Sequence, residues 1–340
     1  MATRDAMRMY FLNAPVVRNV IDGNFRKCVD IVRDAYVAHD RDLTANPHSV
    51  FLRFADRPNA RIIALPAYVG GSVGCSGVKW IASYPDNVHI SLPRASAVIV
   101  LNDCRTGFPF ACLEASTISA ARTAASAVLA AETIWGTKQV RSIGFIGSGF
   151  ISAYIYRFFI DTGWDVGSVY LHDQDRGKAE RFAEHTCCTG QHRIIEVAQS
   201  AEETIRMSEM TICATTAARP YIKDMGAFAH CPVILHISLR DIVPDIILQS
   251  ENIVDDMDHV LRADTSVHLA EKQCGGRDFI SGTLADLIAR RVVLQRNRPV
   301  VFSPFGLGVL DIALAKWVYD EAHERGTLQE AAGFFDGCEV

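Results

Sequence analysis

The fold is decided by the stretch RSIGFIGSGFISAYIYRFF, residues 141–159. It begins with a short apolar run that does not alternate with polar residues, as expected of a strand buried on both faces. Gly144, Gly147 and Gly149 fall within six positions, and an apolar, helix-like segment follows them. A buried strand, a flexible turn and a helix in direct succession are typical of the start of a parallel β–α–β arrangement.

The chain repeats this arrangement between residues 140 and 258. Short apolar runs alternate with helical segments, and one of these segments starts with Ser200 and Glu203 at the spacing of a capping box. Buried strands that alternate with helices predict a doubly wound parallel sheet of the Rossmann type, which we place at residues 126–300. The expected strands are residues 140–147, 168–173, 192–198, 209–216, 232–238 and 252–258.

The first third of the chain has a different pattern. Runs of β-branched or alternating residues, separated by Gly, Pro and Asn-Asp, predict a mostly antiparallel sheet that includes a hairpin. The closing segment, 298–326, has the pattern of strand, turn and helix, and we expect it to return to this domain. The sequence therefore predicts an α/β protein with a second, mixed α+β domain at 1–125, completed by 301–340. The expected elements are strands at 49–54, 61–70, 76–83, 96–103 and 108–115, and helices at 26–39 and 116–135.

Composition and charge argue against several classes of function. The chain has 340 residues and a net charge of −5, and no run of Lys and Arg is dense enough for a phosphate backbone, so nucleic-acid binding is not expected. Eight of the ten cysteines are scattered and Cys187 and Cys188 are adjacent, but there is no CxxC pair and no HExxH motif; we expect reduced thiols and no metal. Residues 1–13 lack a signal-peptide core, and no window of about 18 apolar residues is present. We expect a soluble cytoplasmic protein without a membrane segment.

The glycine loop has the features of a dinucleotide site. Gly147 permits a tight turn, Gly149 lets the backbone approach a pyrophosphate, and Ser152 is small enough for close strand–helix packing. Asp173 lies 24 residues after Gly149, at the end of the next strand. An acid at this place accepts hydrogen bonds from ribose hydroxyls and repels a 2′-phosphate, which favours NAD over NADP. The alternative is a purely structural turn, but strand, loop, helix and acid in this order favour a nicotinamide cofactor.

Arg122 is a charged residue in apolar surroundings. It is the only charged residue between positions 115 and 131, in a helix of small side chains that packs closely on its neighbours. A buried guanidinium needs an anionic partner. That partner is either an internal carboxylate, such as Glu114, or the carboxylate of a substrate held by a bidentate fork.

Three further polar side chains lie on or after predicted strands. Lys79 lies within a strand, where a lysine usually points outward. Asp241 lies just past the end of one buried strand, and Thr215 lies at the end of the preceding one, at the edge where doubly wound sheets bind ligands. Asp241 would serve there as a proton carrier or water activator, or merely as a cap, and Thr215 would border the cofactor.

Seven segments together carry a family resemblance: RIIALPAYVGG (61–71), SGVKWIASYPDN (76–87), RASAVIVLND (94–103), EASTISAARTAASAVLAA (114–131), IGFIGSGFI (143–151), YLHDQD (170–175) and SPFGLGVLDIALA (303–315). In this order and with these separations they resemble the ornithine cyclodeaminase/μ-crystallin family over nearly the whole chain. The resemblance implies a Rossmann-type NAD-binding domain, a domain for substrate binding and dimerisation, and an NAD-dependent oxidoreductase acting on CH–NH bonds of a small amino-acid substrate. It also implies a homodimer formed through the sheet of the first domain.

Carried over residue by residue, the family pattern implies three catalytic positions. Arg122 would hold the substrate α-carboxylate, Lys79 would contact the substrate and move protons, and Asp241 would lie next to the substrate nitrogen. The pattern also implies a set of cofactor contacts: Gly147, Gly149, Phe150, Ile151, Asp173, Thr215 and Ser238.

Three departures from the family pattern are informative. Arg53 replaces a substrate arginine that many members carry near position 49, the segment DIVPDI (241–246) replaces Pro-Gly-Lys of the cyclodeaminases, and Pro304 takes the place of a serine. These departures resemble the branch that makes L-2,3-diaminopropionate for siderophores and related natural products. Arg94 is similar to that branch as well.

The resemblance to this branch implies a particular reaction. It is the NAD-dependent oxidative cleavage of N-(2-amino-2-carboxyethyl)-L-glutamate to L-2,3-diaminopropionate and 2-oxoglutarate. Substrate contacts from Arg53, Lys79, Arg94 and Arg122 would suit its three carboxylates. The alternatives are ornithine cyclodeamination, ketimine reduction, another amino-acid dehydrogenation, and a non-enzymatic NAD-binding protein of the μ-crystallin type.

Overall fold

The structure is a computed structural model that describes residues 8–187 and 192–337. Cys188 and Cys338 of the sequence therefore lie outside the described residues. The chain divides into two compact units. Unit 1 is Met1–Arg122 with Leu307–Val340, and unit 2 is Thr123–Gly306. The division falls inside helix α4 (Ser116–Trp135).

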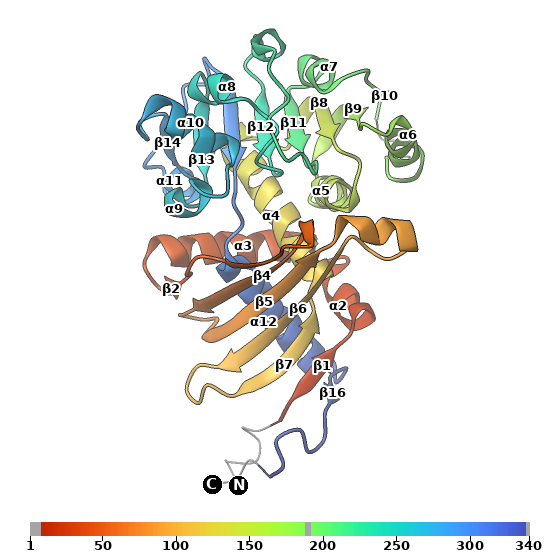
Figure 1. Cartoon of the computed structure of the whole chain (residues 1–340), viewed down its shortest axis with the longest axis vertical. Coiled ribbons are helices and arrows are strands. Elements are labelled where there is room, and N and C mark those ends of the chain that lie inside the picture. Colours follow the sequence, from red (N-terminus) through yellow and green to blue (C-terminus); the bar gives the residue numbers. More distant parts are fainter. Residues whose placement is uncertain (1–7, 188–191, 338–340) are drawn as a thin grey trace. The chain divides into compact units, whose positions relative to one another are not determined.

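Unit 2 contains a parallel sheet whose strands follow the order β10-β9-β8-β11-β12-β15-β13-β14 (Figure 1). The order reverses at β8, which lies between β9 and β11, and this reversal is the switch point of a doubly wound fold. The prediction of a Rossmann-type sheet is confirmed. The strands are β8 (Gln139–Ile146), β9 (Asp165–His172), β10 (Ile194–Val197), β11 (Met210–Cys213), β12 (Val233–His236), β13 (Glu251–Val254), β14 (Ile280–Thr283) and β15 (Val300–Ser303).

The central strands of this sheet explain the runs without alternation. Every residue of β11, β12, β13 and β15 is buried, so both faces of these strands are covered. Ser200 caps α7 by accepting a hydrogen bond from the N–H of Glu203 (3.1 Å), as the spacing predicts. The helical segments are α5 (Phe150–Asp161), α6 (Arg176–His185), α7 (Ala201–Met207), η2 (Met225–Phe228), α8 (Pro244–Leu248), α9 (Met257–Val260), α10 (Ser266–Cys274) and α11 (Leu284–Ile288).

Unit 1 contains a mostly antiparallel sheet in the order β16-β1-β7-β6-β5-β4-β2, with β3 paired to β4. The pair β1 and β7 is parallel, and β6 and β7 form the predicted hairpin. Helix α12 packs on β4, β5 and β6 and against α2 and α3. The strands are β1 (Tyr10–Leu12), β2 (Thr44–Ala45), β3 (Val50–Phe54), β4 (Arg57–Val69), β5 (Cys75–Ser83), β6 (Ala95–Asp103), β7 (Pro109–Glu114) and β16 (Gln329–Glu330), and the helices are α2 (Ala14–Ile21), α3 (Phe25–Asp40), η1 (Pro85–Ile90) and α12 (Gly308–Glu324).

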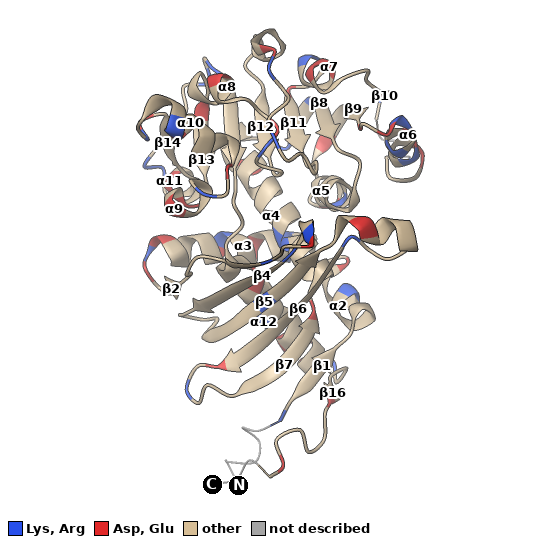
Figure 2. Cartoon of the chain, viewed as in Figure 1, with Lys and Arg blue, Asp and Glu red and all other residues tan. Residues whose placement is uncertain are grey.

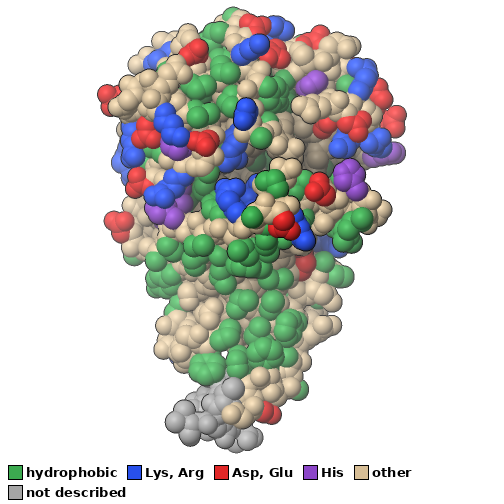
Figure 3. Space-filling model, viewed as in Figure 1, with side chains coloured by type: hydrophobic (Ala, Val, Ile, Leu, Met, Phe, Trp, Pro, Cys, Tyr) green, Lys and Arg blue, Asp and Glu red, His purple; other side chains and the backbone are tan. Residues whose placement is uncertain are grey.

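The two faces of this sheet differ in character. Leu65, Lys79 and Ile99 lie opposite one another in register and are buried on the face that α12 covers. Because side chains alternate between faces, the neighbouring positions point to the other face. Few charged residues lie along these strands (Figure 2), and Figure 3 shows hydrophobic side chains gathered over the sheet. Large exposed apolar residues share this outer face: Phe11, Val50, Leu52, Tyr68, Trp80 and Val98.

The domain boundaries differ slightly from the predicted ones. Strand β15 pairs with β12 and β13, so it belongs to the parallel sheet of unit 2, and only the chain from Leu307 onward returns to unit 1. From the sequence we place this boundary at 300/301, because the apolar pattern of a short buried strand is the same whether the strand belongs to the sheet of unit 1 or to that of unit 2. The other boundary falls at 122/123 rather than 125/126. Among the described residues, no helix is long and apolar enough to cross a membrane.

Candidate active site

The glycine loop begins where β8 ends. Gly147 has φ +93°, and a Cβ at this position would lie 2.6 Å from the carbonyl oxygen of Ala214, so only glycine fits. Its N–H donates to the carbonyl of His172 (2.8 Å). Gly149 is the extended N-cap of α5, and a Cβ there would meet no atom within 4 Å. Gly147 thus has a structural reason to be glycine, while Gly149 leaves open space beside the start of a helix.

The residues around this open space fit a dinucleotide. The hydroxyl of Ser148 is buried and has no hydrogen-bond partner among the described residues. Its N–H donates to Oδ2 of Asp173 (2.8 Å), which ties the glycine loop to the end of β9. Arg176, near Asp173, is paired with Glu180 (2.9 Å) rather than left for a 2′-phosphate. An unpartnered hydroxyl, the free N–H groups of a helix start and a nearby carboxylate are what the pyrophosphate and ribose of NAD require.

The first turn of α5 carries the remaining loop residues. Phe150 is 57% exposed and its ring lies 4.8 Å from that of Tyr154, while Ile151 is partly exposed. Ser152 is fully buried, and its hydroxyl donates to the carbonyl of Gly147 (2.5 Å). The small side chain expected at this position therefore packs between helix and loop.

Asp241 gathers three side chains of unit 2 around one carboxylate. It lies in the loop after β12 and is completely buried. The Thr215 hydroxyl donates to Oδ1, the Ser238 hydroxyl donates to Oδ2, and Nε2 of His236 lies 3.2 Å from Oδ2. The carboxylate thereby links the loop after β11 to the loop after β12, at the carboxyl edge where doubly wound sheets bind ligands.

These contacts hold Asp241 in its ionised form. Burial would raise its pKa, but the hydrogen bonds and charge of His236, together with the two hydroxyl donors, outweigh burial and lower the pKa below its ordinary value. A carboxylate with a lowered pKa accepts protons weakly, so its main effect on a nearby reaction is its negative charge.

Unit 1 holds a second buried cluster, built on Asp311 in the first turn of α12. Lys79 Nζ lies 2.6 Å from Asp311 Oδ2 and 3.3 Å from the hydroxyl of Ser119. Arg122 Nε lies 3.2 Å from Asp311 Oδ1. The Lys79 and Asp311 side chains are 2% and 0% exposed, whereas that of Arg122 is 14% exposed. Lys79 and Arg122 are thus brought together, and Lys79 does not point outward as strand lysines usually do.

Burial and, to a smaller extent, the charge of Arg122 lower the pKa of Lys79, while the ion pair with Asp311 raises it, and together these effects bring the pKa to about 8. Glu114, the internal partner considered for Arg122, instead accepts hydrogen bonds from the N–H groups of Ser116 (2.6 Å) and Thr117 (3.4 Å) at the start of α4. The internal partner of the arginine is Asp311.

Arg53 and Arg94 lie apart from this cluster. Arg53 is exposed on β3, with its guanidinium over the ring of Phe51 (5.3 Å). Arg53 pairs in register with Arg61 of β4, which pairs with Ser83 of β5. Ser83 lies four residues from Lys79 along β5, a distance of roughly 13 Å. Arg94 precedes β6 at the same end of the sheet, and burial lowers its pKa. Within the described residues, neither arginine bonds to Lys79, Arg122 or Asp311.

Three residues of these clusters, Asp311, Ser119 and His236, were not predicted. Asp311 stands alone among apolar residues in GVLDIALA (308–315), the same signal that singled out Arg122. His236 is the last residue of a buried strand, and nothing in the sequence indicates that its ring faces Asp241.

No group of three or more potential metal ligands occurs among the residues that the structure describes. The cysteines within residues 8–187 and 192–337 form no disulfide bonds.

A parallel sheet with a glycine loop at its switch point, beside a buried carboxylate, defines a nucleotide-dependent enzyme fold of the Rossmann class. The chain belongs to the ornithine cyclodeaminase/mu-crystallin family, whose family model matches residues 16–326. The predicted family and fold are therefore confirmed.

The chain is similar to one curated relative and to two solved structures that share its fold. The chain is 27% identical to N-((2S)-2-amino-2-carboxyethyl)-L-glutamate dehydrogenase of Staphylococcus aureus, over 93% of this chain and 96% of the relative. A solved Δ(1)-pyrroline-2-carboxylate reductase of Thermococcus litoralis, in complex with NADH and L-proline, has a TM-score of 0.85 and 24% identity, covering 94% and 99% of the two chains. An archaeal alanine dehydrogenase dimer with bound NAD has a TM-score of 0.84 and 24% identity, covering 96% and 100%. The prediction of an NAD-dependent oxidoreductase agrees with these relatives.

Proposed function

We propose that the protein is an NAD-dependent oxidoreductase that cleaves N-(2-amino-2-carboxyethyl)-L-glutamate to L-2,3-diaminopropionate and 2-oxoglutarate. The reaction consumes one NAD and one water and releases NADH and a proton. The observation that carries the proposal is the 27% identity to the Staphylococcus aureus dehydrogenase over nearly the full length of both chains. The diaminopropionate product would enter the biosynthesis of siderophores or related natural products.

The buried clusters support this chemistry. Lys79 and Arg122 carry two positive charges against the single negative charge of Asp311, which leaves one charge for a substrate carboxylate. In unit 2, the glycine loop, Phe150, Ile151 and Asp173 hold the cofactor, with Thr215 and Ser238 on its nicotinamide side. NAD supplies the hydride acceptor.

Asp241 stabilises positive charge that develops on the substrate nitrogen as hydride leaves the adjacent carbon. Arg53 and Arg94 are assigned to the outer carboxylates of the substrate, which a substrate with fewer carboxylates would not need.

Absorbance at 340 nm tests the proposed reaction. Protein, NAD and N-(2-amino-2-carboxyethyl)-L-glutamate are expected to give NADH and 2-oxoglutarate in equal amounts, with a slower rise when NADP replaces NAD. A rise with L-alanine alone would select an alanine-type dehydrogenase, and ammonia from L-ornithine without net NADH would select cyclodeamination. NAD binding without turnover of any of these amines would leave a non-enzymatic NAD-binding protein.

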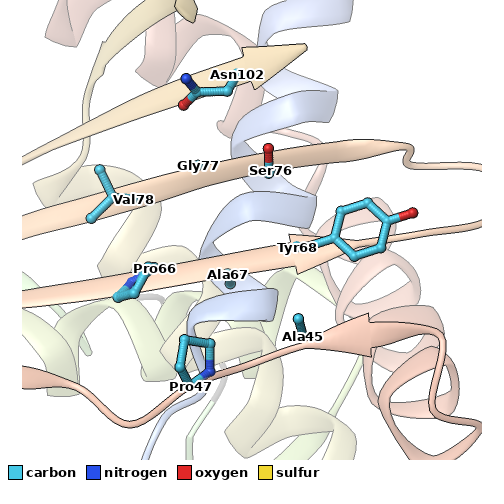
Figure 4. Close-up of a pocket in the computed structure, with 9 residues that line it drawn as sticks. All are labelled: Ala45, Pro47, Pro66, Ala67, Tyr68, Ser76, Gly77, Val78 and Asn102. Atoms are coloured by element: carbon cyan, nitrogen blue, oxygen red, sulfur yellow. The ribbon is translucent and has the colours of Figure 1, made fainter. Parts of the chain in front are cut away.

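We also propose that two copies pair through the outer face of the unit 1 sheet. Trp80 is 44% exposed there and Leu52 is 44% exposed, in a face with few charges. A cavity of about 350 Å³ opens on the same sheet (Figure 4) and is lined mainly by apolar residues: Ala45, Pro47, Pro66, Ala67, Tyr68, Ser76, Gly77, Val78 and Asn102. Contiguous apolar faces of this kind mark protein interfaces, and the archaeal alanine dehydrogenase is a dimer.

Trp80→Glu tests this pairing. A charge in the middle of an apolar interface is expected to weaken the dimer at least about 30-fold in Kd, as for the loss of a central aromatic anchor. Sedimentation velocity over a concentration series measures the change. Val293→Glu is the matched control, because Val293 is an exposed apolar residue of unit 2 (84%). A monomeric parent protein, or a Trp80→Glu variant with an unchanged dimer, would refute the pairing.

A further inference from the structure

The cation cluster of unit 1 is organised by a carboxylate of the protein itself. Asp311 uses one oxygen for Lys79 Nζ (2.6 Å) and the other for Arg122 Nε (3.2 Å), and it is completely buried. It comes from α12, whereas Lys79 comes from β5 and Arg122 from α4. One side chain therefore connects the sheet to both helices at the point where two cations approach each other.

We propose that Asp311 is a positioning residue that holds Lys79 and Arg122 as one preorganised cation pair and thereby fits this cluster to a single substrate carboxylate. The inference rests on the proposed function in one respect, namely that Arg122 binds a carboxylate of the substrate.

The first support is the hydrogen-bond inventory of Arg122. A guanidinium has donors at Nε and at two terminal nitrogens, and it binds carboxylates in a two-pronged fashion. Asp311 occupies Nε. Within the described residues the two terminal nitrogens have no hydrogen-bond partner, and 14% of the side chain remains exposed. Asp311 thus fixes the plane of the guanidinium and leaves its outer edge for a ligand.

The second support is the balance of charge. Lys79 and Arg122 contribute two positive charges and Asp311 one negative charge. Buried charges persist only when they are paired, so the cluster is balanced by one further anion. Without Asp311, the two cations would repel each other and two anions would be needed.

The third support is the environment of Lys79. Its neighbours in register on β4 and β6 are Leu65 and Ile99, which are apolar. The charged groups that act on the amine are Asp311, from α12, and Arg122, from α4, and Ser119 accepts its other hydrogen bond. Burial and Arg122 both lower the pKa of Lys79, and Asp311 alone opposes them. Asp311 therefore keeps the amine protonated, and positive, at neutral pH.

Two substitutions separate the charge of Asp311 from its position. Asp311→Asn removes the charge and keeps the shape, so the Lys79 pKa is expected to fall below its value of about 8. The KM for N-(2-amino-2-carboxyethyl)-L-glutamate is expected to rise at least about 30-fold. The fall of kcat/KM on the alkaline side of the pH profile is expected to begin at lower pH than in the parent protein. Asp311→Glu keeps the charge but moves it by one methylene. It is expected to raise KM while the Lys79 pKa stays near that of the parent protein.

Asp320→Asn is the matched control. Asp320 lies on the same helix and pairs with Lys316 (2.6 and 2.7 Å) in a partly exposed position. This variant is expected to keep the KM and the pH profile of the parent. NAD affinity, followed by NADH fluorescence, is expected to stay within about two-fold in all three variants, because the glycine loop belongs to unit 2.

The Lys79 pKa is read directly by NMR of 13Cε-labelled lysine, with the signal assigned by its loss in Lys79→Met. This readout needs no turnover, so it decides the role of Asp311 even if the protein does not cleave the proposed substrate. An unchanged Lys79 pKa in Asp311→Asn would overturn the inference. If that variant does not fold, Asp311→Glu decides: a KM equal to that of the parent protein would overturn it equally.

Discussion

Arg122→Ala is expected to raise the KM for the amine substrate by about 10²–10³-fold and to leave NAD affinity unchanged. The loss corresponds to two charge-assisted hydrogen bonds from the terminal nitrogens of the guanidinium to one carboxylate. These nitrogens are free of partners within the described residues, whereas Nε is taken by Asp311. Steady-state kinetics with varied substrate, and NADH fluorescence for cofactor affinity, measure the two effects separately.

The same substitution has a second expected effect, on the pH profile. The positive charge of Arg122 lowers the pKa of Lys79, so its removal raises that pKa above about 8. The alkaline limb of kcat/KM is therefore expected to move to higher pH, opposite to the shift expected for Asp311→Asn. Opposite shifts from the two partners of one lysine are difficult to explain by general loss of structure.

Two further variants define what Arg122 contributes. Arg122→Lys keeps the charge but lacks the planar fork, so its KM is expected to lie between those of the parent protein and Arg122→Ala. Arg325→Ala is the control, because Arg325 forms an exposed pair with Glu321 (3.0 Å) at the end of α12. An equal fall in NAD affinity and substrate affinity in Arg122→Ala would mean that the arginine serves the structure only.

The sequence predicts most of the longer strands and the helices α3 and α4 because their patterns are local, whereas it does not predict the strands β1, β2, β14 and β16 or the helices α2 and α10. The buried strands of unit 2 are short apolar runs, and α4 is rich in small residues and ends at Trp135, just before Gly136. The short helices α8, α9 and α11 have five residues or fewer and show no helical period. Strand β15 belongs to unit 2 because it pairs with β12 and β13. The residues of β15 alone do not reveal which strands it pairs with.

The candidate site was predicted in part for the same reason. Gly147 and Asp173 follow from spacing along one strand–turn–helix unit. The partner of Arg122 lies 189 residues away, at Asp311, and the sequence suggested the nearer Glu114, which instead caps α4. His236 contacts Asp241 because of a turn after β12, including Leu239 in a left-handed conformation (φ +69°) that few leucines adopt.

Asp241→Asn is expected to lower kcat by about 10²–10³-fold while the ternary complex with NAD and substrate still forms. The reason is charge. The lowered pKa keeps Asp241 ionised at neutral pH, and in the proposed reaction its negative charge stabilises the positive charge that develops as hydride leaves the carbon beside the substrate nitrogen. An asparagine keeps one acceptor oxygen for one of the hydroxyls of Thr215 and Ser238, and the other hydroxyl rotates to accept from the side-chain amide, so the loops remain joined. Asp286→Asn is the control, since Asp286 accepts comparable hydrogen bonds from Thr283 (2.8 Å) and Arg291 (2.8 Å) at α11 and also has a lowered pKa. The Asp286→Asn substitution is expected to lower the melting temperature without changing kcat.

Single-turnover NADH formation separates the chemical step from binding, and a fully active Asp241→Asn variant would remove this carboxylate from the reaction.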